Sequence, residues 1–413
     1  MRKMKDSGVE WIGEIPQEWN VVRIGSQYTE RKVKVNDTEY PPLSVTMKGV
    51  LPQLATAAKT DAHDDRKLVC KGDFAINSRS DRRGSCGISP MDGSVSLINT
   101  ILSPRDEMNP QYYDWLFHSS MFSDEFYKWG HGIVDDLWTT NWQDMKKISI
   151  PEPPLAEQQR IADFLDKQCS EIDAVLEKTR ASIEEYKKLK QAVITQAVTK
   201  GIRGDRPMRS SNNEWIEAYP CEWKEIKIKW LLNERKERSE EGTEEPLSMS
   251  QKYGLIPTKN LDMVPNMASS FVGAKLVHQG DLVFNKLKAH LGVFAVSQYD
   301  GLVSPDYAVY YPTGIADMKF LEFLFKTPQY INEFKKKSTG VGAGLTRLYT
   351  DSLYSIYCAL PLLEEQLEIR DYLNAKLYEI DALIAKKQQY LTEIENYKKS
   401  LIYEYVTGKK EVV

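Results

Sequence analysis

The sequence has few cysteines and no long apolar run. Its five cysteines are far apart, with no CxxC pair, so we expect reduced thiols and no zinc site. They are Cys70, Cys86, Cys169, Cys221 and Cys358. No apolar stretch approaches the roughly 18 residues of a membrane span, and the opening MRKMKDSGVEWIGEIP lacks the apolar core of a signal peptide. With 41% apolar and 28% charged residues, the composition is that of a soluble globular protein, and we expect it in the cytoplasm.

Motifs of catalysis and cofactor binding are also missing. The histidines are isolated and form no HExxH pattern; they are His63, His118, His131, His278 and His290. The stretch GVGAGLT at Gly340 lacks the lysine of a phosphate loop, and no glycine-rich turn suits S-adenosylmethionine. Paired carboxylates such as Glu184 and Glu185 lie in charged surroundings typical of a solvated surface. We therefore expect no catalytic residue, metal or cofactor in this chain.

The charge has no strong sign, because 55 basic and 59 acidic residues give a net charge of −4. Nucleic-acid binders commonly carry a basic domain or stripe. A DNA-binding role would therefore have to rest on local basic clusters.

What the sequence does contain is a repeat of nearly its whole length. PPLAEQQRIADFLDKQCSEIDA at Pro153 returns as PLLEEQLEIRDYLNAKLYEIDA at Pro361. SGVEWIGEIPQEW at Ser7 returns as SNNEWIEAYPCEW at Ser211. KGDFAINSRSDRRGSCGIS at Lys71 returns as QGDLVFNKLKAHLGVFAVS, with its glycine, aspartate and asparagine kept. A period near 208 residues is far longer than that of a solenoid, so it indicates two copies of a domain with its tail.

The order is globular, helical, globular, helical, and we predict an α+β fold with a pseudo-two-fold internal repeat. Two similar mixed α/β domains, 1–152 and 206–360, would be separated by two helical segments, 153–205 and 361–413. VVRI, LSVTM and DFAIN in the first copy read as strands bounded by turn residues. NPQYYDWLFHSSMFSDEFYKW at Asn109 reads as one helix with an asparagine cap and proline in its first turn. NPQY resembles the NPPY of amino-methyltransferases, but the second copy has Asp317-Met-Lys-Phe, which favours a plain helix start.

The helical segments show a heptad pattern, which predicts a helix of about 30 residues from Ser170 to Thr199, or about 45 Å, ending near Gly201. We expect the two helices to pair antiparallel as a coiled-coil-like spacer, although long core helices of a single domain are the alternative. The expected seam consists of Leu165, Ile172, Val175, Tyr186, Leu189 and Val193 in the first copy, and Leu373, Ile380, Leu383, Ile394, Tyr397 and Leu401 in the second.

Basic and polar residues in corresponding loops of the two copies are the remaining candidates for function. Arg and Lys can contact phosphates and base edges, although surface loops are often basic for no such reason. The DNA-binding candidates are Thr46, Lys48, Arg79, Arg82, Arg83, Ser250, Lys252, Lys286, Lys288, His290, Lys337 and Arg347.

The repeated stretches at Pro153 and Pro361, the GD turns and the EWIG-type openings resemble the specificity (S) subunits of type I restriction-modification systems. The resemblance covers essentially the whole chain, but Leu362 replaces a proline, and Leu367–Glu368 replace Gln159–Arg160. It implies two target-recognition domains that each read one half of a bipartite double-stranded DNA site. It also implies two modification subunits that carry S-adenosylmethionine and methylate adenine at N6, and two restriction subunits that use ATP and Mg²⁺.

From half-sites one helical turn apart, we predict two short motifs split by roughly 5–8 unspecified base pairs. Two other classes stay open: an enzyme without a recognisable motif, and a coiled-coil scaffold that joins proteins and does not bind DNA. Turnover by the purified chain would reveal the first, and failure to bind any duplex would favour the second. Neither the target bases nor the presence of a restriction subunit follows from the sequence.

Overall fold

The structure, a computed structural model, describes residues 2–53, 63–132, 138–250, 253–263, 270–340 and 346–412. Its contacts divide the chain into two compact units. Unit 1 consists of residues 1–180 and 388–413, and unit 2 of residues 181–387. We call residues 2–152 head 1 and residues 206–360 head 2. In the part of the chain that is described, no helix is both long enough and apolar enough to cross a membrane.

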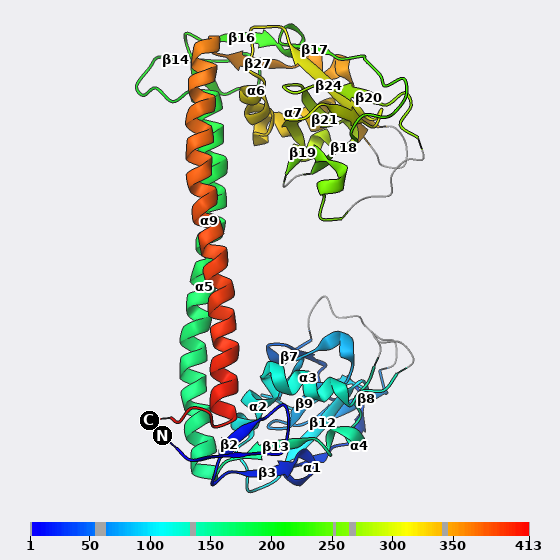
Figure 1. Cartoon of the computed structure of the whole chain (residues 1–413), viewed down its shortest axis with the longest axis vertical. Helices are drawn as coiled ribbons and strands as arrows, with labels where there is room; N and C mark the ends of the chain where they lie inside the picture. The colour runs from blue at the N-terminus through cyan, green and yellow to red at the C-terminus, as the bar shows by residue number, and fades with distance from the viewer. Residues whose placement is uncertain are drawn as a thin grey trace. The chain divides into compact units, whose positions relative to one another are not determined.

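Head 1 is built from short antiparallel strands with small helices between them (Figure 1). Its largest sheet has the strand order β10-β9-β12-β4. The strands are β1 (Met4–Asp6), β2 (Glu14–Pro16), β3 (Asn20–Arg23), β4 (Tyr28–Glu30), β5 (Lys34–Val35), β6 (Leu43–Thr46), β7 (Gly49–Pro52), β8 (Arg66–Val69), β9 (Phe74–Asn77), β10 (Cys86–Ile88), β11 (Gly93–Ser96), β12 (Asn99–Pro104) and β13 (Ser149–Glu152). The helices are α1 (Ile24–Gln27), α2 (Pro110–His118), α3 (Ser120–Lys128) and α4 (Trp142–Met145).

Head 2 has the same plan, and its largest sheet has the order β17-β24-β21-β22. The strands are β14 (Met208–Ser210), β15 (Ala218–Pro220), β16 (Lys224–Lys227), β17 (Leu232–Glu234), β18 (Leu247–Ser250), β19 (Gly254–Pro257), β20 (Lys275–Val277), β21 (Leu282–Asn285), β22 (Phe294–Val296), β23 (Gly301–Val303), β24 (Tyr307–Pro312), β25 (Thr339–Gly340), β26 (Thr346–Arg347) and β27 (Tyr357–Leu360). The helices are η3 (Ile228–Trp230), η4 (Thr258–Asn260), η5 (Lys286–Leu291), α6 (Met318–Phe325), α7 (Pro328–Lys337) and α8 (Thr350–Tyr354).

The strand pairs of the two heads correspond one to one along most of the chain. β13 pairs with β3 as β27 pairs with β16, β6 with β7 as β18 with β19, and β11 with β8 as β23 with β20. All of these pairs are antiparallel, and β3–β13 and β16–β27 each pair the beginning of a head with its end. The internal repeat and the α+β class predicted from the sequence are confirmed.

Two long helices, α5 (Leu155–Lys200) and α9 (Leu363–Val406), each contribute one end to each unit (Figure 1). In unit 1, Lys398 lies 2.6 Å from Asp173. In unit 2, Lys190 lies 2.6 Å from Asp381, and Arg203 lies 2.8 Å from Glu368. Within unit 2 the partner number falls as the α5-side number rises, so the helices run antiparallel, as predicted.

Each head buries its core against both helices. In unit 1 the core includes Ile161 and Leu165 from α5 together with Ile402 from α9. In unit 2 it includes Val198 from α5 and Leu373 from α9. The helix ends are thus part of the globular cores, and this tertiary burial stabilises helices whose middle parts are largely exposed.

The seam between the helices differs from the predicted one. The predicted residues Val175, Leu189, Leu383 and Tyr397 have exposed fractions of 40%, 47%, 44% and 56%. Buried residues lie instead four positions after the leading residue of each heptad, and they are Cys169, Leu176, Ile183, Ala197, Leu377 and Ile384. Steps of three and four both fit the heptad, so the leading positions alone do not decide which neighbour faces the partner. Of the other predicted seam residues, Leu165, Leu373, Ile380 and Leu401 are buried, and Ile172, Tyr186, Val193 and Ile394 are half-buried.

Two helix predictions also need correction. The stretch after Asn109 forms two helices because Ser119 is extended, with φ −67° and ψ 142°, and its hydroxyl accepts a hydrogen bond from Phe122 N. Asn109 caps α2 as expected, accepting from Gln111 N at 2.9 Å. Helix α5 begins at Leu155, not Ser170, and its 46 residues make it longer than the predicted rod.

Candidate nucleic-acid interface

The GD turns, which precede most of the candidate residues, are held by the same buried ion pair in both heads. Asp73 accepts from Arg31 Nε at 2.6 Å and from Cys70 N at 2.8 Å. Asp281 accepts from Arg235 Nε at 2.7 Å and from the backbone N–H of His278, three residues earlier, at 2.8 Å. Each carboxylate has bonds to both an arginine and the backbone, which fixes the turn from which the next strand and loop start.

The glycine of each turn explains why the pattern is kept. Gly72 and Gly280 have φ of +90° and +92°, a conformation that side chains with a Cβ rarely adopt. The asparagine five residues after the glycine then accepts from the backbone of the next loop, Asn77 from Arg79 N and Asn285 from Leu287 N. The GDxxxN pattern is therefore architectural, and it positions the loops that follow it.

The arginines of this arrangement were missed by the sequence analysis, although a signal was present. The triplet Glu-Arg-Lys occurs at Glu30 and again at Glu234, each time at the end of β4 or β17. The first residue of the triplet, Glu30 in head 1 and Glu234 in head 2, has different surroundings in the two heads.

The repeated Glu-Gln of the long helices joins each helix to its head. Glu365 accepts from Trp223 Nε1 at 3.1 Å and is ion-paired with Arg206, both charged side chains being buried. Glu157 likewise accepts from Trp19 Nε1 at 3.0 Å and is ion-paired with Arg2. A buried charge pair of this kind ties the first turn of a long helix to the first strands of its head.

The glutamine makes a second connection. Gln158 accepts from Asn109 N at 2.9 Å and donates to Pro153 O at 2.8 Å. Gln366 accepts from Asp317 N at 2.8 Å and donates to Pro361 O at 2.9 Å. Each amide thus bridges the entry of the long helix and the cap of a head helix, so the motif that is most conspicuous in the sequence serves the junction and not a reaction.

In head 1, the structure brings the arginine candidates together in the loop between β9 and β10. Arg79 and Arg82 both pair with Asp81, at 3.3 and 3.7 Å. Arg83 pairs with Asp124 at 3.1 Å and lies over the ring of Tyr127 at 5.3 Å. The arginines are therefore held by carboxylates, and DNA phosphates would have to compete with these partners.

The other head 1 candidates lie at the tip of the β6–β7 hairpin. The Thr46 hydroxyl accepts from Lys48 N at 3.1 Å and donates to Gly49 O at 2.9 Å, so it shapes the turn. The Lys48 side chain is exposed. This hairpin lies against β10, where a Cβ on Gly87 would come within 2.7 Å of Gly49 Cα, so it is close to the strand that follows the arginine loop.

In head 2 the candidates are more dispersed. Lys288 in η5 and Lys337 at the end of α7 are exposed. Arg347 pairs with Asp306 at 2.6 Å. Ser250 accepts from Tyr253 N at 3.4 Å at the β18–β19 turn. Lys252 and the side chain of His290 lie outside the described residues.

The Lys286 side chain is only 16% exposed and faces the interior of head 2. Its ammonium lies 3.6 Å from Glu234, which also accepts from Lys275 Nζ at 3.2 Å and from the Thr350 hydroxyl at 2.9 Å. Burial works against ionisation of this carboxylate, but the Thr350 hydrogen bond and the two ammonium groups hold the pKa of Glu234 below its usual value. Lys286 thus completes an internal charge network.

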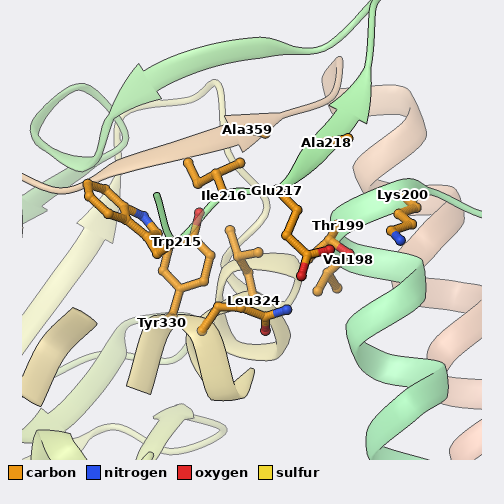
Figure 2. Close-up of a pocket in the computed structure, with 11 residues that line it drawn as sticks. Val198, Thr199, Lys200, Trp215, Ile216, Glu217, Ala218, Leu324, Tyr330 and Ala359 are labelled. Atoms are coloured by element: carbon orange, nitrogen blue, oxygen red, sulfur yellow. The ribbon is translucent and has the colours of Figure 1, made fainter. Parts of the chain in front are cut away.

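In the residues that the structure describes, no group of three or more His, Cys, Asp or Glu residues suits a metal ion. Figure 2 shows a pocket in unit 2 between the end of α5 and head 2, with Trp215, Glu217 and Tyr330 around it. Its volume of about 20 Å³ holds about one water molecule and no substrate.

Comparisons with known proteins agree with this architecture. Residues 62–185 match the family described as "Type I restriction modification DNA specificity domain". Two curated relatives are from Methanocaldococcus jannaschii. The type I restriction enzyme MjaVIII specificity subunit is 23% identical, over 96% of this chain and 94% of its own length. The putative MjaX specificity subunit is 27% identical, over 97% and 96%.

Two solved structures share the fold. A chain from a study of complex assembly and conformational transition of the type I R-M system has a TM-score of 0.72 at 15% identity, covering 96% of this chain and 99% of its own. The HsdS subunit from Thermoanaerobacter tengcongensis has a TM-score of 0.53 at 16% identity, covering 96% and 98%.

Proposed function

We propose, from its similarity to the specificity subunits of type I restriction-modification systems, that the chain reads an asymmetric, bipartite double-stranded DNA site with its two heads. Head 1 would read one half-site and head 2 the other. The observation that carries this proposal is that the heads share their frame, down to the Arg31–Asp73 and Arg235–Asp281 pairs, but differ in the loops that the frame positions.

The loop differences are large in chemical terms. The loop after β9 contains Arg79, Arg82 and Arg83, whereas the equivalent loop after β21 contains Lys286 and Lys288. Base readout depends on the side chains that reach the groove, while phosphate contacts set the position of the protein. Two heads with one frame and different loops suit a site whose halves differ in sequence.

We further propose that the helices dock two modification subunits. Five side chains that the α5–α9 seam leaves exposed are apolar or aromatic: Val175, Leu189, Leu383, Tyr390 and Tyr397. Leu383, Tyr390 and Tyr397 follow one another at seven-residue steps, and Val175 and Leu189 lie two such steps apart, so each helix carries exposed apolar residues beside the seam that suit a partner helix. Restriction subunits would join through this assembly.

Catalysis would then lie in the partners. S-adenosylmethionine would be bound by the modification subunits, which methylate adenine at N6, and ATP and Mg²⁺ by the restriction subunits. This chain would contribute sequence recognition and the spacing between the half-sites, and the roughly 5–8 base-pair gap remains our prediction. Inserting four residues, about one turn of helix, near Lys178 should change that gap and leave both motifs unaltered.

The test is sequencing of methylated bases across the genome of a host that expresses the modification subunit, with and without this chain. We expect a bipartite, adenine-methylated motif that appears only when the chain is present. An unchanged pattern of methylation, with the assembled complex verified by gel filtration, would contradict the proposal and return attention to a scaffold role.

A further inference from the structure

Head 1 contains an open cleft of about 530 Å³ between the end of β4, the start of β8 and the segments around Arg79 and Trp142. Glu30 and Lys67 supply its charged floor, Arg79 lies at its side, and Ile98 and Trp142 supply apolar walls. These residues come from five separate stretches of head 1, so the cleft is formed by the fold and not by one loop. Nothing described so far uses Glu30.

The Glu30 carboxylate has hydrogen-bonding capacity that its own head does not fill. Its side chain is 12% exposed, and in the described residues its buried Oε2 accepts no hydrogen bond. The Lys32 ammonium lies 3.1 Å from Oε2, but it is 68% exposed and lacks the geometry of a hydrogen bond. Lys67 donates to Asn99 O at 2.7 Å instead. A carboxylate oxygen without a hydrogen bond in the lining of an open cleft calls for N–H or O–H donors from a ligand.

In head 2 the equivalent carboxylate has partners from its own head. The corresponding Glu234 accepts from Lys275 and from Thr350, and the Lys286 ammonium completes its surroundings. By alignment of the repeats, Ser78 stands where head 2 has Lys286, and Trp142 where it has Thr350. Two of the three groups that surround the carboxylate in head 2, the Lys286 ammonium and the Thr350 hydroxyl, thus have no counterpart in head 1.

The replacements leave the space open and change its character. Ser78 is buried and its hydroxyl bonds to the carbonyl of Ile98, so it does not reach the role of Lys286. Trp142 is half-buried and presents an aromatic surface in place of a short hydroxyl. A ligand must therefore supply donors toward Glu30, accept from the cations Lys67 and Arg79, and offer a flat surface to Trp142.

We propose that this cleft binds an unpaired nucleobase with two adjacent N–H donors, which is the pattern of guanine. A carboxylate can accept from both N1–H and N2–H of guanine, and the neighbouring O6 suits the Lys67 ammonium. Stacking of a base on an indole is a general feature of single-strand recognition. Adenine lacks the second donor, and cytosine offers only its N4 amino group.

The base can come from a free nucleotide or from an unpaired position in bound DNA, and both sources share this chemistry. The second source deepens the proposed DNA function of head 1 and rests on it, whereas the first does not. Measuring both therefore separates failure of this inference from failure of the proposed function.

The first arm titrates the full-length protein with guanosine monophosphate and, in parallel, adenosine and cytidine monophosphate by calorimetry. We expect guanosine monophosphate to bind best, and Glu30→Gln to weaken it by about tenfold or more, because an amide donor then faces the N–H groups of the base. Ser78→Lys should also abolish binding by placing the head 2 lysine in the cleft. The matched control is Glu234→Gln in head 2, which should leave binding unchanged.

The second arm uses a duplex with one guanine opposite an abasic position, compared with adenine in the same place. Preference for guanine that Glu30→Gln removes, in either arm, supports the proposal, and the arm in which it occurs identifies the source. Absence of a guanine preference in both arms would overturn it, as would a preference that survives both Glu30→Gln and Ser78→Lys in variants whose thermal unfolding matches that of the unmodified protein.

Discussion

Head 1 and head 2 hold the same buried positions with groups of different chemistry. Asp114 and His118 of α2 occupy the positions that Glu322 of α6 and Lys326, the residue after α6, occupy in head 2. Glu322 pairs with Lys326 at 2.6 Å and accepts from Val296 N at 2.9 Å, whereas Asp114 lies 3.6 Å from His118. The lysine of head 2 keeps its charge through the physiological range whether or not the head is folded, whereas the histidine of head 1 loses its proton on unfolding above about pH 6.5.

The junctions with the long helices also differ between the heads, in the burial of their ion pairs. Arg206 and Glu365 are both about 8% exposed and Arg206 lies within the chain, whereas Arg2 is the second residue and its side chain is 15% exposed. A duplicated frame therefore does not give duplicated energetics. Its contacts recur, but their burial and freedom to relax differ between the copies.

The largest expected effect is at the head 2 junction. We expect Glu365→Ala to destabilise unit 2 by about 3–5 kcal/mol, because it leaves the buried Arg206 without its partner. Glu157→Ala should cost clearly less, since the Arg2 side chain is 15% exposed, against 8% for Arg206, and can turn toward water more easily. Hydrogen exchange resolved by peptide would report the free energy of opening for each unit separately.

The double variant Arg206→Ala with Glu365→Ala is the control for this comparison. It should recover part of the loss by removing the stranded charge. If the two single glutamate variants destabilised their own units equally, the difference in burial would not govern the junctions.

The second effect concerns the GD turns. Arg235→Met should destabilise head 2 by about 3 kcal/mol, because Asp281 is about 3% exposed and would be left with backbone donors only. Arg31→Met should cost less, since the Ser103 hydroxyl also donates to Asp73 at 2.9 Å. Chemical unfolding monitored by peptide-resolved exchange would compare them, and Ser103→Ala combined with Arg31→Met should bring head 1 to the cost seen in head 2.

Much of this frame was predictable from the sequence, because a repeat of more than 200 residues constrains every element twice. Asn109 and Asp317 were read as helix caps from their equivalence, and both accept hydrogen bonds from the first turn of their helices. The GD turns were found but not their arginine partners, because the bond between Arg31 and Asp73 joins residues 42 positions apart. Only the repeated Glu-Arg-Lys triplet pointed to it.

The helix seam and the cleft show two different limits. The positions four residues after the leading residues of the heptads hold Leu176, Ile183, Leu377 and Ile384, which are more apolar than the positions three residues after them, so the sequence contained the correct seam. The cleft could not be predicted in this way. It depends on the absence of a lysine at Ser78 and on the three-dimensional meeting of Glu30 with Trp142, which only the fold brings together.

A smaller effect should appear in the dependence of the stability of head 1 on pH. Burial opposes the charge of His118, but Cys86 and Asp114 raise its pKa to about 10, well above the usual 6.5. A raised pKa means that the stabilisation is complete below about pH 6.5 and is lost as the pH rises toward 10, so head 1 should lose on the order of 2 kcal/mol between pH 6.5 and pH 9. Head 2, with Lys326, should not change through this equivalent pair.

Exchange measured at several pH values, corrected for the intrinsic rate, would test this. Asp166 of α5 also raises the pKa of Asp114, and Cys86 of β10 raises that of His118. The variant His118→Lys is therefore the cleanest comparison, because it places the head 2 residue among these same neighbours. It should make the two heads respond alike. If the free energy of opening of head 1 still fell with rising pH in His118→Lys, the titrating group would be another residue.

The smallest effects should be those of single loop cations on DNA. Arg82 and Lys288 follow the same turn in the two heads, and each is exposed. Replacing either with alanine should weaken binding by about 1 kcal/mol and lower the slope of log K against log salt by about 1, if it contacts a phosphate. Arg82→Ala should act through the first half-site and Lys288→Ala through the second, which duplexes with one half-site scrambled would separate.

Lys286→Met provides the sharper contrast, because Lys286 is engaged with Glu234 and its loss should lower the stability of head 2 before it changes the salt slope. If Lys286→Met changed the slope as much as Lys288→Ala does, the internal network of head 2 would have to open on DNA, and the difference between a filled and an open head would then belong to the free protein alone.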